Sequence, residues 1–181
     1  MDHRNVILYI AASLDGFIAA PNDDLSFLSL VEKNGEDYGY TDFIKTVDTV
    51  ILGRKTYDWV MKHASAFLHT DKETYIITRT ARPGNENVNF YTGNLKELVQ
   101  NLKKKAGKNI FVDGGAEIVH ELLLENLIDE FIISVIPVLL GKGVRLFNDG
   151  RPELYLELVR SKQYKTGLIQ LYYKTARMKS S

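Results

Sequence analysis

The sequence predicts an α/β domain with a mainly parallel sheet and an antiparallel pair of strands at its C-terminal edge. Apolar runs without polar alternation, such as residues 6–12, are typical of strands buried on both faces. Helical patterns separate these runs, and strands that alternate with helices favour a parallel sheet. Two further strand-like segments close the chain. A length of 181 residues suits a single domain over residues 1–181.

The first predicted strand, residues 6–12, ends in the turn-forming residues 13–16. Residues 19–40 predict a loop with at least one short helix. Thr41 is expected to cap a further helix that continues through Val47, because a threonine side chain can accept a hydrogen bond from a free backbone N–H group at a helix start.

The remaining strands and helices alternate along the chain. Strands are predicted at residues 49–52, 73–78, 88–91, 109–113 and 129–136. One helix follows Gly53 and runs through Met61, and another follows Gly115. A third starts at Asn94, where Glu97 completes a capping-box-like pattern. The last two strands, predicted at residues 154–159 and 168–174, are joined by a turn near residues 165–167 and form the antiparallel pair.

Composition and charge exclude several classes of protein. The chain has 23 basic and 23 acidic residues, whereas a nucleic-acid-binding domain usually shows a basic excess. It has no cysteine, which excludes thiolate metal sites and fits a reducing cytoplasm. Its four histidines lack the i, i+4 spacing of a helical metal site, so no metal is expected. No apolar run is long enough to cross a membrane. A cytoplasmic protein that binds a small molecule is therefore expected.

Three predicted strand ends carry residues that suit phosphate, and ligands of open α/β sheets bind beyond such ends. At Gly114-Gly115 the backbone can approach a ligand closely because neither residue has a Cβ atom. The helix that follows offers free N–H groups to an anion. A tight turn without a ligand is the alternative, and the spaced glycines of the Rossmann pattern are absent.

The second strand end is Gly53-Arg54-Lys55-Thr56, where two cations and a hydroxyl stand at a helix start. Cations are unfavourable at that end of the helix dipole, and a bound anion would remove the conflict. A solvated basic first turn is the alternative. Thr78 and Arg79 follow the third strand end. Three such ends in one sheet predict an extended ligand with two phosphates.

Carboxylates are the candidate catalytic groups. Asp24 precedes Leu25 and Phe27, and an apolar surrounding would raise its pKa so that it could donate a proton. Asp15 follows the first strand in a tight turn. For both residues a capping role is the alternative. Glu117 lies in the first turn after the glycine pair, where the helix dipole alone accounts for it.

Four segments, taken together and in this order, resemble a known family. Residues 10–19, Ile-Ala-Ala-Ser-Leu-Asp-Gly-Phe-Ile-Ala, are similar to the opening of dihydrofolate reductases. They are closer to the C-terminal reductase domain of the bifunctional riboflavin-biosynthesis deaminase–reductase. Residues 48–57 and 110–117 resemble that family's NADPH-phosphate segments, and residues 129–147 match the riboflavin-type domain best. The resemblance implies a dihydrofolate-reductase-like three-layer fold with a mainly parallel eight-stranded sheet.

The resemblance also implies NADPH as the cofactor and assigns positions around it. Ala11 would offer its backbone to the nicotinamide amide. The adenosine 2′-phosphate and the pyrophosphate would lie near two groups of residues. The first group follows two strand ends and comprises Gly53, Arg54, Lys55, Thr56, Thr78 and Arg79. The second surrounds the glycine pair and comprises Gly114, Gly115, Ala116 and Glu117.

The implied reaction is that of a 5-amino-6-(5-phosphoribosylamino)uracil reductase, in which hydride passes from the nicotinamide to C1′ of the opened sugar. A pterin reductase of the dihydrofolate-reductase type and a non-catalytic NADPH-binding protein are the alternatives. The loop from Asp15 to Asp24 is shorter than in dihydrofolate reductase, which weighs against a pterin pocket. The chain lacks the His-x-Glu and Pro-Cys-x-x-Cys motifs of the deaminase, so it is not expected to deaminate.

An apolar stretch at residues 132–140 precedes the last strands. A monomer of this size is not expected to cover all of it, and the riboflavin-type relatives imply dimers. We therefore expect a symmetric homodimer that uses the last strands.

Overall fold

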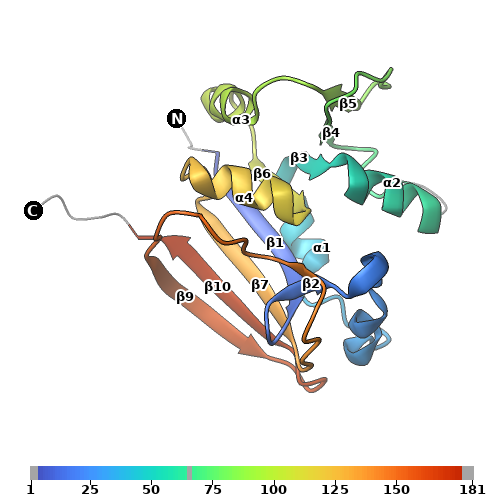
Figure 1. The fold of residues 1–181 in the computed structure, drawn as a ribbon. Coiled ribbons are helices and arrows are strands. Elements are labelled where there is room, and N and C mark those ends of the chain that lie inside the picture. Colours follow the sequence, from blue (N-terminus) through green and yellow to red (C-terminus); the bar gives the residue numbers. More distant parts are fainter. Residues whose placement is uncertain (1–3, 65–66, 177–181) are drawn as a thin grey trace, which may run out of the picture.

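An eight-stranded sheet organises the computed structural model, which describes residues 4–64 and 67–176 (Figure 1). The strands follow the order β5-β4-β3-β6-β1-β7-β10-β9. The first six of these pair in parallel, and β10 pairs antiparallel with both β7 and β9. This arrangement confirms the predicted mainly parallel sheet with an antiparallel C-terminal edge. The strands are β1 (Val6–Ser13), β3 (Val47–Gly53), β4 (Glu73–Ile77), β5 (Val88–Tyr91), β6 (Asn109–Gly114), β7 (Glu130–Ile136), β9 (Leu156–Gln163) and β10 (Ile169–Thr175).

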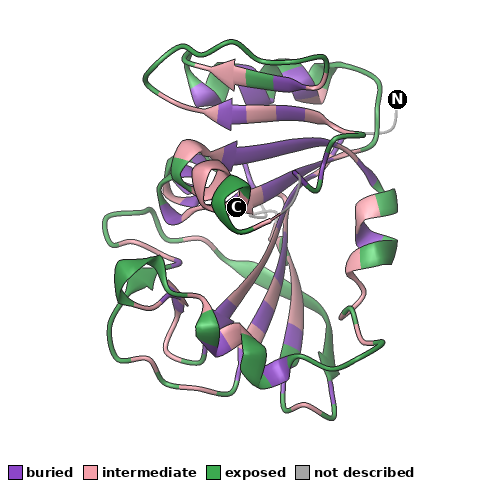
Figure 2. Ribbon diagram, turned by 90° about the vertical axis from the view of Figure 1, so that its right-hand side faces the viewer, coloured by how far each residue is buried: buried purple, intermediate pink, exposed green. Residues whose placement is uncertain are grey.

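Helices cover both faces of the sheet and make a three-layer structure. On one face α3 (Leu95–Lys104) and α4 (Ala116–Leu124) pack against Leu8 and Val112. On the other face α1 (Tyr40–Lys45) and α2 (Arg54–His63) pack against Phe111 and neighbouring apolar residues. The buried residues accordingly gather in the central strands (Figure 2). None of the described helices is long and apolar enough to cross a membrane.

Two short strands and two 3₁₀ helices lie outside these layers. β2 (Phe17–Ala19) and β8 (Val144–Arg145) pair antiparallel as a separate small sheet. The helices η1 (Pro21–Asp23) and η2 (Ser26–Val31) occupy the segment that the sequence predicts as a loop with a short helix. The β2–β8 pair was not predicted, because segments of three and two residues carry no periodicity.

The predicted start and end of the first α-helix are wrong. α1 begins at Tyr40 after Gly39, whose φ of 83° lies in the left-handed region. Its first N–H groups are held by Asp37, whose two carboxylate oxygens accept bonds from the backbone N–H of Gly39 and of Thr41, both at 2.9 Å. An aspartate cap therefore replaces the expected threonine cap. Val47 begins β3 rather than ending the helix.

The apolar stretch at residues 132–140 is covered only in part, as the sequence led us to expect. β7 lies between β1 and β10, so that Ile132 is 8% exposed and Ile136 is 1% exposed. Beyond the end of β7, Leu139 is 69% exposed. A larger group of exposed apolar side chains lies on and around β9, which begins two residues later than predicted. They are Tyr155, Leu156, Leu158, Val159 and Ile169.

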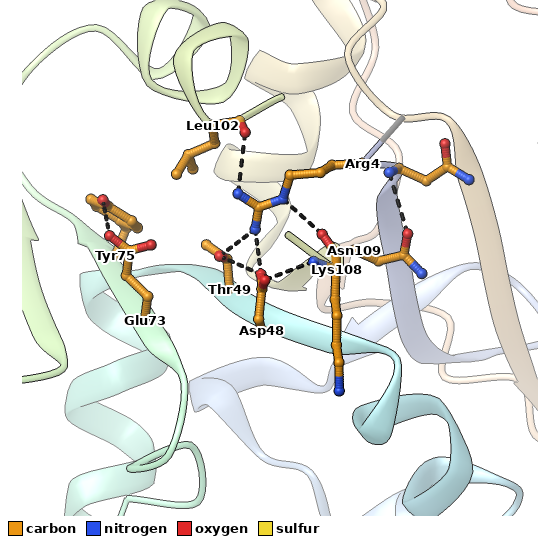
Figure 3. Close-up of polar contacts among 9 residues, drawn as sticks. Arg4, Asp48, Thr49, Glu73, Tyr75, Leu102, Lys108 and Asn109 are labelled. Atoms are coloured by element: carbon orange, nitrogen blue, oxygen red, sulfur yellow. Dashed lines mark hydrogen bonds and ion pairs between the residues drawn. The ribbon is translucent and has the colours of Figure 1, made fainter. Parts of the chain in front are cut away.

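A buried arginine ties the amino ends of the central strands together (Figure 3). Arg4 is 3% exposed, and its guanidinium donates to the carbonyl oxygens of Lys108 at 2.7 Å and of Leu102 at 3.1 Å. It also donates to Thr49 Oγ1 at 2.6 Å and forms an ion pair with Asp48. Each of its three nitrogens therefore has a partner, as a buried charge requires.

Arg4→Met should strongly destabilise the fold. It removes the donors from two carbonyl groups and breaks the ion pair with Asp48. Breaking a buried pair in this way typically costs about 3 kcal/mol or more in the free energy of unfolding. Urea unfolding followed by circular dichroism measures the loss.

Lys96→Met is the matched control for Arg4→Met, because Lys96 pairs with Glu125 at 2.6 Å on the surface with both side chains more than 40% exposed. Surface pairs of this kind contribute about 0–1 kcal/mol. Equal losses in the two variants would show that the Arg4 network is not a main support of the sheet.

Candidate active site

The strand ends that the sequence singled out meet at one edge of the sheet. β4, β3, β6, β1 and β7 are consecutive and parallel, so their carboxyl ends point the same way. Gly53 ends β3, Gly114 ends β6 and Ser13 ends β1. The structure thus brings the phosphate-friendly segments beside Ala11 of β1.

Two helices start side by side at this edge, and each N-cap is a glycine. α2 begins directly after Gly53, and α4 begins directly after Gly115. A Cβ atom on Gly53 would lie 3.8 Å from the backbone nitrogen of Gly115, and one on Gly115 would lie 3.2 Å from Thr56 Oγ1. The free N–H groups of both helices therefore converge on one place, which is the arrangement that binds anions.

Gly114 is the position in this segment that requires glycine. Its φ of 112° lies in a region that side chains of L-residues rarely adopt. Gly115 has a φ of −81°, which any residue can adopt. The peptide bond between the two is cis. A side chain at Gly115 would therefore crowd the space near Thr56 without straining its own backbone.

The cations around the convergence are partly paired. Arg54 Nε lies 3.4 Å from Asp58 Oδ2, and Arg82 Nη1 lies 3.3 Å from the other oxygen of Asp58. Lys55 Nζ lies 3.7 Å from Glu117 Oε1, with both side chains largely exposed. Asp58 therefore supplies part of the negative charge that the sequence led us to expect from a bound anion.

Thr78 and Arg79 follow β4 at the same edge. The Thr78 hydroxyl lies 3.3 Å from the Thr80 carbonyl and accepts a bond from the Thr80 N–H, which makes a tight local turn. Arg79 is exposed, and it forms no ion pair with any residue that the structure describes. Arg54 and Arg82 both pair with Asp58, so Arg79 has the fewest described partners of the arginines near the two helix starts. Its guanidinium is available to a phosphate.

A cavity of about 460 Å³ opens on the α1 side of the sheet. Ala11 lines it, in register with Ser134 of β7. Tyrosine rings form much of its wall, and its floor and wall include Tyr9, Tyr38, Tyr40, Ser134 and Ile136. The cavity thus borders the strand to which the resemblance assigns the nicotinamide.

A hydrogen-bond network fixes the floor of the cavity. The side-chain amide of Gln170 donates to Tyr9 Oη and to Ser134 Oγ, each at 3.0 Å. The Tyr9 hydroxyl in turn donates to the carbonyl oxygen of Tyr38 at 3.0 Å. Burial raises the pKa of Tyr9 to about 12. The phenol therefore stays protonated at neutral pH and holds Tyr38 in place.

Asp15 is a loop anchor. Its carboxylate accepts bonds from Ser13 Oγ at 2.6 Å, from Leu140 N at 3.1 Å and from Gly141 N at 2.7 Å. The Ser13 hydroxyl and these N–H groups lower its pKa from 3.8 to about 2. The group is ionised at neutral pH, so it has no proton to donate there.

Asp24 lies on an exposed turn. Its carboxylate accepts bonds from the backbone N–H of Ser26 at 2.9 Å and from Ser26 Oγ at 3.0 Å. These contacts hold the start of η2, and the side chain is not enclosed by Leu25 and Phe27. The apolar surrounding that the sequence analysis required for a proton donor is not present.

Asp113, which the sequence analysis did not single out, lies at the same edge of the sheet. It directly precedes Gly114 in β6, and its Oδ2 lies 3.5 Å from Nε2 of His69, which is 4% exposed. The His69 ring packs edge-on against Phe67 and Phe111. The available signal was the position of Asp113 at the carboxyl end of a strand, beside the glycine pair.

No cluster of three histidine, aspartate or glutamate side chains within residues 4–64 and 67–176 could hold a metal ion.

The residues present fit a dinucleotide cofactor. The starts of α2 and α4 pack closely, since a Cβ atom on Gly53 would lie 3.3 Å from Ile118 Cγ1 and one on Gly115 would lie 3.2 Å from Thr56 Oγ1. Their glycines leave backbone N–H groups uncovered, and Arg54 and Thr56 in the first turn of α2 add a cation and a hydroxyl. The cavity beside Ala11 continues along the same sheet edge. A phosphate at the helix starts and a ring beside β1 would be held by groups of this chemistry.

Fold and site define an α/β protein of the dihydrofolate-reductase-like class. The chain belongs to the family of the RibD C-terminal domain, a reductase domain of riboflavin biosynthesis, whose family model matches residues 4–170.

Two proteins of Bacillus subtilis (strain 168) match over nearly their whole length. The uncharacterised protein YwjB is 43% identical over 171 residues, which is 94% of this chain and 97% of YwjB. The uncharacterised protein YyaP is 32% identical and covers 96% of each chain.

Among solved structures, a putative riboflavin biosynthesis protein from Shewanella sp. PV-4 has a TM-score of 0.87 and 29% identity, over 96% of this chain and 99% of that one. The Thermotoga maritima diaminohydroxyphosphoribosylaminopyrimidine deaminase/5-amino-6-(5-phosphoribosylamino)uracil reductase has a TM-score of 0.71 at 14% identity. The match covers 96% of this chain but only 57% of the Thermotoga protein.

Substitutions in the glycine pair should separate folding from ligand binding. Gly114→Ala places a side chain at a φ of 112° and should lower the melting temperature, since such strain costs about 1–3 kcal/mol. Gly115→Ala should leave the melting temperature of the protein alone nearly unchanged, and should weaken NADPH binding at least about tenfold by crowding the convergence. Calorimetry and thermal melts measure both. Normal NADPH binding by Gly115→Ala would reduce the pair to a turn.

Asp15 should contribute to stability in a defined pH window. Its pKa is about 2 in the folded protein and 3.8 as a model value, so its stabilising effect is present above about pH 4 and is lost as the pH falls toward 2. Asp15→Asn should lower the urea midpoint at pH 7 and should show a shallower fall in that midpoint between pH 5 and pH 3. An unchanged pH dependence would contradict the assigned contacts.

Proposed function

We propose that the chain is a cytoplasmic NADPH-dependent reductase whose hydride acceptor binds in the cavity beside Ala11. One observation carries the proposal: the starts of α2 and α4 converge at Gly53 and Gly115 on the same sheet edge as the cavity. The family supports a reductase role, and the convergence is the part of the site that suits the cofactor's phosphates.

NADPH, when bound, supplies a hydride to the acceptor. The backbone at Ala11 orients the nicotinamide end, and the Gln170 network keeps the cavity floor rigid. Arg54, Lys55 and Arg79 supply positive charge toward the phosphates. With Asp15 ionised and Asp24 exposed, water or the substrate itself supplies any proton that the reaction needs.

The acceptor that the family favours is 5-amino-6-(5-phosphoribosylamino)uracil, which offers an imine-like C1′ in its opened form. The Thermotoga relative is named for the reduction of this compound. The reaction is mainly one of positioning, since the chain has only to hold the acceptor carbon against the nicotinamide. The assignment of this acceptor is tested by adding the compound to the protein and NADPH and measuring the loss of NADPH absorbance.

Two alternatives have distinct signatures. Turnover of dihydrofolate that antifolates block would favour a pterin reductase. Tight NADPH binding without oxidation by any acceptor would favour a non-catalytic binding protein.

We also propose a symmetric homodimer through β9. All eight residues of this edge strand are exposed, and its exposed apolar side chains include Leu158 at 54% and Val159 at 59%. An unpaired edge strand with apolar side chains is a surface that pairs readily with a second copy.

The cofactor assignment predicts a preference for NADPH over NADH. A charge-assisted contact to the 2′-phosphate is worth roughly 1.5–3 kcal/mol, so NADPH should bind at least about tenfold more tightly. Arg79→Met should remove much of that preference while leaving NADH binding unchanged. A fluorescence titration measures all four affinities. Equal affinities of the unaltered protein for NADPH and NADH would contradict the assignment of NADPH as the cofactor.

The dimer assignment predicts that Leu158→Glu separates the subunits. A buried like-charged pair across a two-fold interface opposes association. Light scattering at micromolar concentration should report a dimer for the unaltered protein and a monomer for the variant. Met61→Glu, on the exposed part of α2, is the control and should remain dimeric. A monomer before any substitution would contradict the proposal.

A further inference from the structure

A buried amide lies behind the floor of the cavity beside Ala11. Gln170 of β10 is completely buried and does not itself line the cavity. Its side-chain NH₂ group lies 3.0 Å from Tyr9 Oη and 3.0 Å from Ser134 Oγ, and both of these residues do line the cavity. The Gln170 amide therefore connects the interior of the sheet with the surface that a ligand would meet.

The Tyr9 hydroxyl determines which way the Gln170 amide points. A phenol hydroxyl has one hydrogen, and Tyr9 donates it to the carbonyl oxygen of Tyr38 at 3.0 Å. If the amide were turned over, its oxygen would face the Tyr9 oxygen with no hydrogen between them. The NH₂ group therefore faces Tyr9 and Ser134. Burial raises the pKa of Tyr9, and the hydrogen bond from Gln170 opposes that rise, as expected of a donor to the phenol oxygen.

The oxygen of the Gln170 amide faces two tyrosines that do not line the cavity. Tyr164 Oη donates to this oxygen at 3.3 Å, and Tyr172 Oη donates to it as well. The guanidinium carbon of Arg160 lies 3.9 Å from the centre of the Tyr172 ring, and Lys162 Nζ lies 4.4 Å from the centre of the Tyr164 ring. Positive charge therefore stands at the outer end of a series of hydrogen bonds that all point toward the cavity, and such bonds polarise one another.

Ser134 is the last member of this series. Its oxygen accepts a hydrogen bond from Gln170, and its own hydroxyl hydrogen is donated to no group within residues 4–64 and 67–176. The side chain is 4% exposed and lines the cavity. A buried donor requires a partner, and an acceptor atom of a ligand in the cavity would supply one.

The place of Ser134 in the sheet relates this hydroxyl to the nicotinamide position. Ser134 of β7 is in register with Ala11 of β1, and paired strands lie about 4.8 Å apart. The other side chains of the cavity lining with N–H or O–H groups to spare are Lys33, Asn34 and Tyr40, which lie between η2 and the first turn of α1. Ser134 is therefore the donor that the sheet itself presents beside Ala11.

We propose that Ser134 is a specificity-determining residue that donates its hydroxyl hydrogen to a ring carbonyl oxygen of the hydride acceptor. The inference rests on the proposed reductase function and names the group that selects its acceptor. The residues of β1 and β7 that line the cavity are Tyr9, Ala11, Ser134 and Ile136, and none is charged. A single neutral donor suits a neutral oxygen. An amino group or a carbon atom at the same place would leave the buried hydroxyl unpaired, which is costly.

The test compares two pyrimidines of nearly the same shape. 5,6-Diaminouracil has two ring carbonyl oxygens, and 2,4,5,6-tetraaminopyrimidine has amino groups in their place. Calorimetry measures the affinity of each compound for the protein saturated with NADP⁺. The unaltered protein should bind 5,6-diaminouracil at least about fivefold more tightly than the tetraamino compound, which is the size of effect that one matched hydrogen bond produces.

Substitutions of Ser134 make the comparison specific to its hydroxyl. Ser134→Ala should weaken the binding of 5,6-diaminouracil about fivefold and should change the affinity for 2,4,5,6-tetraaminopyrimidine less than about twofold. Ser134→Thr keeps the hydroxyl and should keep the preference. The affinity for NADPH should be the same in all three proteins. A purely structural role of the serine would weaken the binding of both pyrimidines alike.

A second substitution tests the orientation of the amide without removing the Ser134 hydroxyl. In Tyr9→Phe the Gln170 amide is free to turn over and to accept the Ser134 hydrogen, so the preference for 5,6-diaminouracil should fall. Thr175→Val is the control, because it removes a half-buried hydroxyl that donates to the Ile128 carbonyl at 2.8 Å at the other end of β10. It should change neither affinity.

Three results overturn the inference: equal losses for both pyrimidines in Ser134→Ala, a full preference in that variant, or no binding of either compound to the unaltered protein. Weaker binding of NADPH by Ser134→Ala would assign the hydroxyl to the nicotinamide and also overturns it. A full preference in Tyr9→Phe would contradict the amide orientation on which the inference depends. A failure of the unaltered protein to bind NADPH and NADP⁺ overturns the reductase function instead, and calorimetry on the protein alone then still decides whether Ser134 selects a carbonyl group.

Discussion

The buried guanidinium of Arg4 fixes the amino edge of the sheet, and the geometry of the opposite edge depends on it. Arg4 precedes β1, and its partners come from the start of β3, the end of α3 and the turn before β6. β3, β6 and β1 are adjacent and parallel, so holding their amino ends in register also decides which residues reach the carboxyl edge. A slip of one residue would turn each side chain to the other face. The meeting of Gly53 with Gly115 is therefore set by a charge at the far end of the strands.

Along the carboxyl edge different groups follow different strands, and Asp58 and Glu117 lie among the basic residues. The basic residues follow β3 and β4, the glycine pair follows β6, and the carboxylates lie beside β1 and α1. An extended ligand could place its phosphates at the helix starts that follow β3 and β6 and a ring in the cavity beside β1. The helix starts therefore bear on how the cofactor binds, and the cavity beside β1 bears on which acceptor binds.

The sheet was predictable because its central strands carry local signals. The apolar runs at residues 6–8 and 110–112 are buried on both faces, as their pattern indicates, whereas residues 9–11 are half-buried. The start of α1 was not, because its cap is Asp37, and the choice between Asp37 and Thr41 depends on Gly39 adopting a positive φ. β2 and β8 form only because each pairs with the other across the chain. Neither strand can therefore be predicted from its own residues alone.

The same distinction runs through the site. Backbone groups at a helix start bind anions wherever glycines allow approach, so the Gly53 and Gly114-Gly115 segments could be singled out from the sequence. A carboxylate's role depends on what surrounds it after folding. Asp15 and Asp24 stand next to backbone N–H groups that hold them as caps. Within the described part of the chain, Asp113 accepts no backbone hydrogen bond and faces His69 instead. Only the tertiary structure shows which partner each of these carboxylates has.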